Sequence, residues 1–403
     1  MVKSIRLSQF NGFVVCMLVA AHVFAQQEEK RDPFDFSIGV RVEATDNRDS
    51  SEVNEEDNVD IFVYPEFAFF VTSDQSSLDV YYRPSYRYRS DPGVLQNEDE
   101  IFHDFTLHAD HEATANTKLR LNNIFTYTDD PSISEGAIFR RNATYIRNAI
   151  EAGVMHAFTP LTKADLSGLY DIKRYDDGEV ADESDQDEYR VTLLGTRQVS
   201  RTAQIRAQGM FRHYEQDSSI GVIRDFDVAR VAGGFEKVFS PEFVTIVDVG
   251  ADFVEYDDAS LDSETFPYVG IDGRYSPNPG FRISGFLDHG VRNSDVFPFA
   301  SQEFTEFKID LEHDTTPTVT LGLRGTARLS KYDLESRPSS APPPAPGLAA
   351  DGDEDTLVLD ADATVALSDT ARIKVLYRIE DIDSEVARSF TKNTVGASIN
   401  VDI

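Results

Sequence analysis

Charged side chains recur at alternate positions in several stretches of the chain. Arg83, Arg87 and Arg89 fall on one face of any strand that contains them, as do Arg324 and Arg328. Side chains two residues apart in a strand point to the same side of a sheet, so each stretch would carry a row of guanidinium groups. Such rows can pair with carboxylates on neighbouring strands, or they can act on charged solutes that move along a pore.

Acidic side chains follow the same alternation in neighbouring stretches, so basic rows are expected to face acidic rows across a sheet. Two interpretations stay open: ordinary cross-strand ion pairs on a solvated wall, or a transverse field that orients a polar or anionic solute. The candidates for a water-facing wall are Arg83, Arg87, Arg89, Asp104, Asp110, Arg206, Arg212, Arg282, Arg292, Glu306, Asp310, Arg324, Arg328, Asp360, Arg372 and Arg378.

The histidines give little support for catalysis. His108 has the parity of the charged rows, whereas His103, His111 and His289 have the opposite parity. None has a serine at a spacing that suggests a catalytic triad. The sequence also lacks a glycine-rich phosphate loop and a His or Cys cluster with metal-ligand spacing. We therefore expect no enzyme activity, no catalytic residue, no metal and no cofactor.

The charged rows alternate with apolar side chains, which predicts strands with one face in lipid and one in water. In the stretch 318–332, Leu321 and Leu329 lie on one face and Arg324 and Arg328 on the other. About eighteen such strands are predicted, over residues 34–44, 58–72, 77–89, 99–112, 117–128, 142–158, 163–176, 186–199, 203–215, 225–239, 243–256, 264–276, 281–292, 301–314, 318–332, 355–367, 371–383 and 389–403.

The connections between these strands alternate in length. Tight turns such as 159–162 and 240–242 follow the even-numbered strands, and longer acidic segments such as 46–57 follow the odd-numbered ones. Outer-membrane barrels have short periplasmic turns and long external loops, so both termini are predicted to lie in the periplasm. The Pro-rich segment 334–354 is predicted to be a mobile external loop rather than a constriction.

The start of the chain predicts secretion. Residues 1–25 combine a basic start, a short apolar run and Ala25 before a cleavage point, which is typical of a signal peptide. Residues 26–33 would then be a periplasmic segment and residues 34–403 the barrel. Cys16, the one cysteine, falls in the signal peptide, so the mature chain would have no disulfide.

Charge and hydropathy limit the classes of partner that this protein can bind. The net charge of −33 becomes −35 when Lys3 and Arg6 are removed with the signal peptide, which argues against nucleic acid. No stretch after residue 25 approaches the roughly twenty apolar residues of a spanning helix. An integral protein would then have to be a closed barrel that contacts outer-membrane lipids.

Aromatic residues near the ends of the odd-numbered strands are predicted to form a girdle at the outer interface, where rings with polar tips collect. The sequence has no Trp, so Tyr and Phe would form this girdle alone. The residues concerned are Tyr86, Tyr88, Phe125, Tyr127, Tyr170, Tyr175, Phe211, Tyr214, Phe253, Tyr256 and Tyr332.

The last strand alternates up to the final residue. Thr394, Gly396, Ile399, Val401 and Ile403 resemble the insertion signal of outer-membrane barrels, with Ile403 in place of the usual terminal Phe. The barrel-assembly machinery is therefore an expected partner. A soluble β-sandwich or β-helix would also alternate, but the two classes of connection and the apolar terminus favour an all-β, antiparallel, up-and-down transmembrane barrel.

The segments 34–40, 64–67 and 398–403 resemble the putative beta-barrel porin 2 family of Gram-negative outer-membrane proteins. The resemblance implies an integral barrel in the outer membrane, associated with exopolysaccharide export and with periplasmic polysaccharide-export proteins as partners. Three hypotheses follow: a conduit for an exopolysaccharide or related polar polymer, a general diffusion porin for small polar solutes, and a non-conducting structural or adhesive barrel. With about eighteen strands the lumen is wide enough for water.

Overall fold

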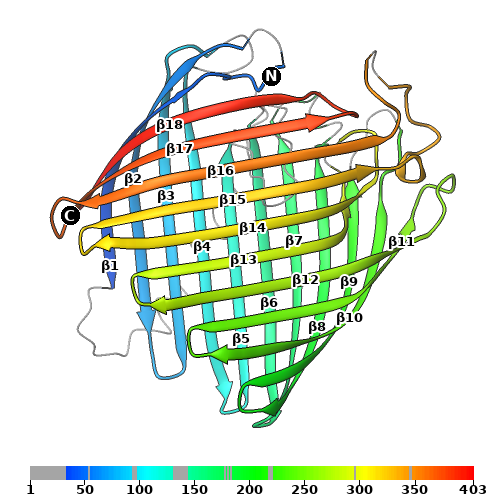
Figure 1. Ribbon diagram of the computed structural model, residues 1–403, viewed down its shortest axis with the longest axis horizontal. Coiled ribbons are helices and arrows are strands. Elements are labelled where there is room, and N and C mark those ends of the chain that lie inside the picture. Colours follow the sequence, from blue (N-terminus) through cyan, green and yellow to red (C-terminus); the bar gives the residue numbers. More distant parts are fainter. Residues whose placement is uncertain are drawn as a thin grey trace, which may run out of the picture.

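Eighteen antiparallel strands form one closed barrel in the computed structural model (Figure 1). The structure describes residues 33–52, 55–92, 98–129, 144–176, 178, 181, 184–216, 221–294, 296–344 and 347–403. The predicted signal peptide 1–25 and all of the predicted segment 26–33 except Pro33 lie outside these residues. The strands are β1 (Phe34–Thr45), β2 (Asn58–Thr72), β3 (Ser76–Arg89), β4 (Asp99–Thr114), β5 (Thr117–Thr128), β6 (Tyr145–Thr159), β7 (Thr162–Tyr175), β8 (Gln186–Ser200), β9 (Ala203–Gln216), β10 (Phe226–Ser240), β11 (Phe243–Tyr256), β12 (Glu264–Asn278), β13 (Phe281–Asn293), β14 (Ser301–Thr316), β15 (Val319–Tyr332), β16 (Gly352–Ala366), β17 (Ala371–Ser384) and β18 (Phe390–Asp402).

Closure of the sheet explains why the chain can sit in lipid. Each strand pairs with its sequence neighbours, and β18 pairs with β1, for example through Val401 and Ile38. A closed ladder leaves no strand edge unpaired, which is the condition for β-structure in a bilayer. The predicted fold class and strand number are confirmed. Among the described residues, no helix is long and apolar enough to cross a membrane.

Alternation along each strand separates an apolar outer face from a polar inner face. In β15, Leu321 and Leu329 are 41% and 51% exposed on the outer face, whereas Arg328 and Ser330 are buried on the inner face. The register carries this division across the neighbouring strands, since Arg328 lies opposite Glu306 in β14 and Thr356 in β16. The exposed apolar side chains are those that lipid would cover.

The connections are of two kinds, as predicted. Two residues join β6 to β7 (160–161) and β14 to β15 (317–318), whereas β15 and β16 are joined by residues 333–351. The short turns and the longer connections lie at opposite ends of the barrel, and the strands of the two walls cross one another in the view of Figure 1. The end with the longer connections is called the mouth below.

One predicted bound of the connections is wrong, and part of the Pro-rich segment is packed, while the mobility of that segment stays a prediction. β16 begins at Gly352 rather than at residue 355, because the acidic stretch 352–354 pairs with β15 and β17 instead of remaining a loop. The Pro-rich segment is also partly packed: it opens with a 3-10 helix, η2 (Leu334–Ser336), in which Ser336 is buried, and Pro338 is buried as well. The Ser336 carbonyl accepts a hydrogen bond from the Ala300 amide at 2.8 Å, so this part belongs to the mouth's packing.

The predicted aromatic girdle is only partly correct. Tyr86 and Tyr88 do lie exposed on the outer face of β3. Phe211 and Tyr214 are three residues apart, so they must point to opposite faces of β9, and Tyr214 is buried inside. Three further residues of the predicted girdle are also buried on the inner face because of their position in the alternation. They are Tyr175, Tyr256 and Tyr332.

The ladder between β2 and β3 is interrupted near the middle of the two strands. Regular pairs end at Val63 with Tyr86 and resume at Phe67 with Tyr82. Pro65 and Pro84 lie within this gap, and neither has an amide N–H to donate to the ladder. The gap is therefore a direct consequence of two prolines in adjacent strands.

The barrel closes where β1 pairs with β18, and this contact requires a glycine at position 39. The Tyr64 hydroxyl in β2 donates to Asn400 Oδ1 in β18 at 2.7 Å, so its side chain passes over β1 at Gly39. A Cβ at Gly39 would lie 2.2 Å from the Tyr64 ring and 2.4 Å from Asn400 Oδ1. Only glycine allows the ring to lie flat across the first and last strands.

We expect Gly39→Val to destabilise the barrel by about 1–3 kcal/mol, the usual cost of overpacking a filled site. The measurement is the temperature at which the folded band is lost on a semi-denaturing gel. Gly209→Val is the matched control, since a Cβ there meets no atom within 4 Å. Equal behaviour of the two variants would contradict the role given to the Gly39 contact.

Candidate functional site in the barrel interior

All sixteen charged residues predicted to share a water-facing wall lie on the inner face. The register of the strands that carry them places their side chains on the same side of the sheet as the cavity described below. Their contact with a transported solute stays a prediction. They fall into three groups: a wall of β1–β6 and β17–β18 at the mouth, the opposite wall at the mouth, and the region toward the short turns.

The opposite wall is filled by a segment that turns inward. Residues 294 and 296–300, between β13 and β14, bring Val296 and Phe299 into a buried cluster with Tyr332 and Val386. The Ala300 carbonyl accepts a hydrogen bond from Gln216 Nε2 in β9 at 3.1 Å. This inward segment therefore bonds to a strand four positions away around the barrel.

Further contacts fix the inward segment from both sides. Asn293 Nδ2 at its start donates to Gln186 Oε1 in β8 at 2.5 Å. Ser301 Oγ at its end lies 2.6 Å from the Tyr256 hydroxyl of β11. Together these bonds hold the segment against β8, β9 and β11, so this half of the mouth is packed rather than open.

A buried ion network lies beneath the inward segment. Glu306 of β14 accepts two bonds from Arg328, at 2.8 and 3.1 Å, and contacts Lys308 at 2.7 Å and Arg292 at 3.7 Å. Glu306 and Arg328 are 3% and 2% exposed. A carboxylate this deeply buried is tolerable only because several cations surround it.

A cavity of about 470 Å³ occupies the other half of the mouth. It is lined from β1–β6, β17 and β18 and by Arg48 and Asp129 of the connections. Aromatic rings share the lining with charged groups, since Arg41 lies over the Phe62 ring and Arg87 over Phe102, at 4.1 and 4.6 Å from the centroids. The open part of the mouth is thus a polar recess along one wall.

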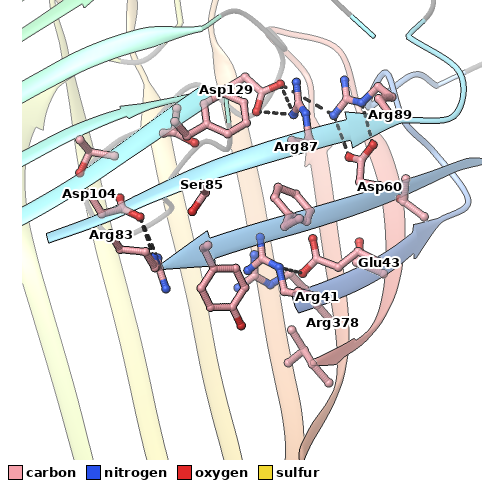
Figure 2. Close-up of a pocket in the computed structure, with 18 of the residues that line it drawn as sticks. Arg41, Glu43, Asp60, Arg83, Ser85, Arg87, Arg89, Asp104, Asp129 and Arg378 are labelled. Carbon is pink, nitrogen blue, oxygen red and sulfur yellow. Dashed lines mark hydrogen bonds and ion pairs between the residues drawn. The ribbon is translucent and has the colours of Figure 1, made fainter. Parts of the chain in front are cut away.

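Ion pairs organise this recess (Figure 2). Arg83 Nη2 donates to Asp104 at 2.7 Å, and Arg89 forms two 3.0 Å bonds to Asp60 on the neighbouring strand. Arg87 reaches Asp129, beyond the end of β5, at 2.6 and 2.7 Å. The pairs tie β2, β3, β4 and the β5 end together on the inner face, which favours cross-strand pairing for most of these charges.

One member of the recess belongs to the connection after β1. Arg48 is buried and hydrogen-bonded to Asp49, Glu56 and the Asp91 carbonyl. The hydrogen bond from Arg48 holds the pKa of the Asp49 carboxyl below its usual range, and the same bond raises the pKa of Arg48. The connection is therefore anchored over the recess by a permanent charge.

Toward the short turns the predicted residues form more exposed pairs. Arg324 donates to Asp362 at 2.6 Å and Arg372 to Asp402 at 2.9 Å. The other predicted residues of this part are Asp110 with Lys118, Arg282 with Glu312, Asp310 opposite Arg324 and, deeper in the barrel, Arg206 with Asp248. Arg378, which pairs with Asp360, lines the recess.

The recess also contains residues that the sequence analysis did not name. Arg41, Arg147 and Lys392 have the inward parity of their strands, so alternation could have found them. Arg48 and Asp129 lie in connections, where no periodicity indicates a direction. Only the folded barrel brings these two into the wall.

Most of the described histidines pair with polar side chains of neighbouring strands. His108 bonds to Asn122 and Asp110 on the inner face. A Ser–His pair does occur on the outer face, with Ser76 Oγ 2.8 Å from His111 Nδ1, but no carboxylate contact to His111 is present in the part of the chain described here. Within the same ranges, no group of three or more His, Cys, Asp or Glu side chains could hold a metal.

Comparison with protein families gives a match over residues 35–403 to the family described as putative beta-barrel porin 2. The chain belongs to this family. The match covers the whole described barrel and agrees with the resemblance seen in the sequence. Membership of this family makes the chain a porin-like barrel that is integral to the outer membrane.

Solved structures of outer-membrane proteins have a similar fold. OccAB4 of Acinetobacter baumannii has 9% identity and a TM-score of 0.47, over 93% of this chain and 99% of that one. OpdK of Pseudomonas aeruginosa, solved with vanillate, has 10% identity and a TM-score of 0.48, over 92% and 99%. The siderophore receptor PirA of Pseudomonas aeruginosa has 8% identity and a TM-score of 0.44, over 94% and 81%. No curated protein matches the sequence.

The residues of the predicted insertion signal divide between the two faces of this porin-family barrel. Thr394 and Gly396 point inward, whereas Ile399, Val401 and Ile403 are exposed on the outer face. The Ile403 amide donates to the Phe36 carbonyl at 2.9 Å, so the strand pairs to its last residue. Recognition of this strand by the assembly machinery stays a prediction.

We expect Glu306→Gln to lower the free energy of unfolding by about 3–5 kcal/mol, because it leaves buried cations without their carboxylate. Urea unfolding in detergent measures the change. It is followed by far-UV circular dichroism, because the protein has no Trp whose fluorescence could report unfolding. Glu312→Gln is the matched control, since its pair with Arg282 is exposed to solvent and should matter by less than about 1 kcal/mol. A small effect at Glu306 would contradict the network's structural role.

Proposed function

We propose that this barrel is a passive diffusion channel for small polar solutes across the outer membrane. The observation that carries the proposal is the polar recess at a mouth whose other half is packed by the inward segment. A closed barrel of this strand number can hold water, and a charged inner wall keeps it wet. A mouth narrowed on one side favours small solutes over bulky ones.

The orientation and the absence of catalysis belong to the same proposal. The longer connections would face the exterior and the short turns the periplasm, with both termini periplasmic, as in other outer-membrane barrels. The engagement of His108 by Asn122 and Asp110 agrees with a channel without enzyme activity. Secretion would depend on removal of residues 1–25.

Export of an exopolysaccharide is the second candidate. It is supported by the family resemblance and by the aromatic rings of Phe62, Tyr64, Phe102 and Tyr145 in the recess. Ring faces beside hydroxyl and charged groups suit the apolar faces and hydroxyls of sugars. Periplasmic polysaccharide-export proteins would then be partners of the short-turn end.

Shortening the inward segment tests the diffusion channel. Replacing residues 294–300 with two glycines should increase single-channel conductance in planar bilayers several-fold, because it opens the packed half of the mouth. As a control for barrel integrity, the unboiled variant must run as the folded band on a semi-denaturing gel, and this band must disappear when the sample is boiled. Unchanged conductance would contradict a constriction at this segment, and a wild-type barrel without conductance would favour a structural or adhesive role.

Gene deletion separates diffusion from export. Under the diffusion proposal, deletion slows uptake of small polar solutes and leaves secreted polysaccharide unchanged. Loss of secreted polysaccharide with intact uptake would instead establish the second candidate. Both are measured on the same strain, with the wild-type gene restored on a plasmid as the control.

A further inference from the structure

The charge of the recess differs from that of the chain. Its lining contains eight basic side chains and five acidic ones, in a protein whose net charge is −33. We propose that the recess is a binding site for small anions and that Lys392 is the residue that sets the preference for anions over cations. This inference rests on the proposed function, since selectivity has meaning only in a conducting barrel.

Lys392 differs from the other seven cations of the recess. Each of the seven arginines has an ion pair, among them Arg147 with Asp171 at 2.5 Å and Arg378 with Asp360 at 2.6 Å. Lys392, on β18, forms no ion pair or hydrogen bond within the described residues. Its register partner on β17 is Glu380, which instead lies 3.7 Å from Arg378.

Paired and unpaired cations act differently on a solute. The carboxylate beside a paired arginine cancels most of its charge at the distance of a passing ion. The Asp171 and Asp360 partners lie outside the recess lining, so the excess of arginine in the lining overstates the field. An ammonium without an ion pair loses less of its charge to a neighbouring carboxylate, and charged side chains that line a pore select the ions that pass.

A second cation of the recess has an unsatisfied hydrogen-bond donor. Arg89 is 7% exposed, and its Nη1 atom is buried without a hydrogen-bond partner in the described part of the chain. A buried N–H donor without a partner is costly, and a carboxylate or halide would satisfy it. Arg89 on β3 is separated from Lys392 on β18 by β1 and β2, so it lines the same recess without sharing one bound ion with Lys392.

The acidic connections at the mouth favour cations, whereas the recess is proposed to favour anions. They attract cations, but solvent-exposed charges are screened over a Debye length of about 8 Å at physiological ionic strength. The recess lies inside the barrel, where the walls reduce screening and every permeating ion must pass close by. The charge of the recess should therefore outweigh that of the connections.

The test is the reversal potential of the purified barrel in planar bilayers under a KCl gradient. The wild type should prefer chloride over potassium. Lys392→Gln should lower the chloride-to-potassium permeability ratio about two- to threefold, and Lys392→Glu should invert the preference, as expected for loss or reversal of one charge near the path. Single-channel conductance is recorded in the same experiment.

Lys374→Gln is the matched control. Lys374 also faces the interior, from β17, but it lies outside the recess and pairs with Asp362 at 3.3 Å. Its removal should leave the permeability ratio close to that of the wild type. A ratio that moves equally in the two lysine variants would overturn the assignment to Lys392.

Failure of the two proposals can be told apart. A conducting barrel that prefers potassium, or whose ratio is unchanged in Lys392→Gln, overturns the anion site and leaves the diffusion channel standing. A folded barrel that does not conduct overturns the proposed function and this inference with it. Loss of the folded band on boiling shows that each variant has formed the barrel before it is measured.

Discussion

Satisfaction of the backbone is the constraint on which this structure depends. In lipid no water can bond to a free N–H or C=O group, so a sheet must close on itself. β1 and β18 meet that condition here, and the Tyr64 side chain crosses β1 at Gly39 to bond with β18. Once the sheet is closed, every strand has one face in lipid and one in the interior, and the alternation of side chains follows directly.

Closure then determines what the interior must contain. Polar residues on alternate positions cannot reach the surrounding solvent, so they pair with one another or contact water inside the barrel. In the described barrel some of these residues are buried in ion pairs and others face a cavity. Glu306 and Arg328 are buried in a network under the inward segment, whereas Arg83 and Asp104 face a cavity on the other wall. The interior is therefore asymmetric, although the strands that enclose it are regular.

This asymmetry connects the fold to the proposed channel. A uniform lumen would offer one wide path, but the bond from Gln216 to the Ala300 carbonyl and the bond from Asn293 to Gln186 hold residues 294 and 296–300 inside the mouth. The remaining path runs beside strands from both ends of the chain, where β17 and β18 lie next to β1, β2 and β3. Residues as distant in sequence as Arg41 and Lys392 thus share one recess.

Much of this could be predicted from the sequence because a strand has a period of two residues. Parity alone placed the sixteen charged candidates on one face, and the lengths of the connections marked two ends of the barrel. Parity applied to single residues also shows why Tyr214 is buried although Phe211 is exposed. The prediction for the girdle was wrong because it considered position along the strand and ignored the face.

The packing of the mouth was decided only by the tertiary structure. Residues 294 and 296–300, Arg48 and Asp129 lie in connections, which have no period. Nothing in their spacing shows whether they turn inward or outward. Ion-pair partners are likewise set by which strands are neighbours: Lys392 lies opposite Glu380, and Glu380 lies 3.7 Å from Arg378, whereas Lys392 has no ion pair among the described residues. Local alternation therefore determined the barrel and its two faces, whereas long-range contacts decided which part of the interior is filled and which charge is left free.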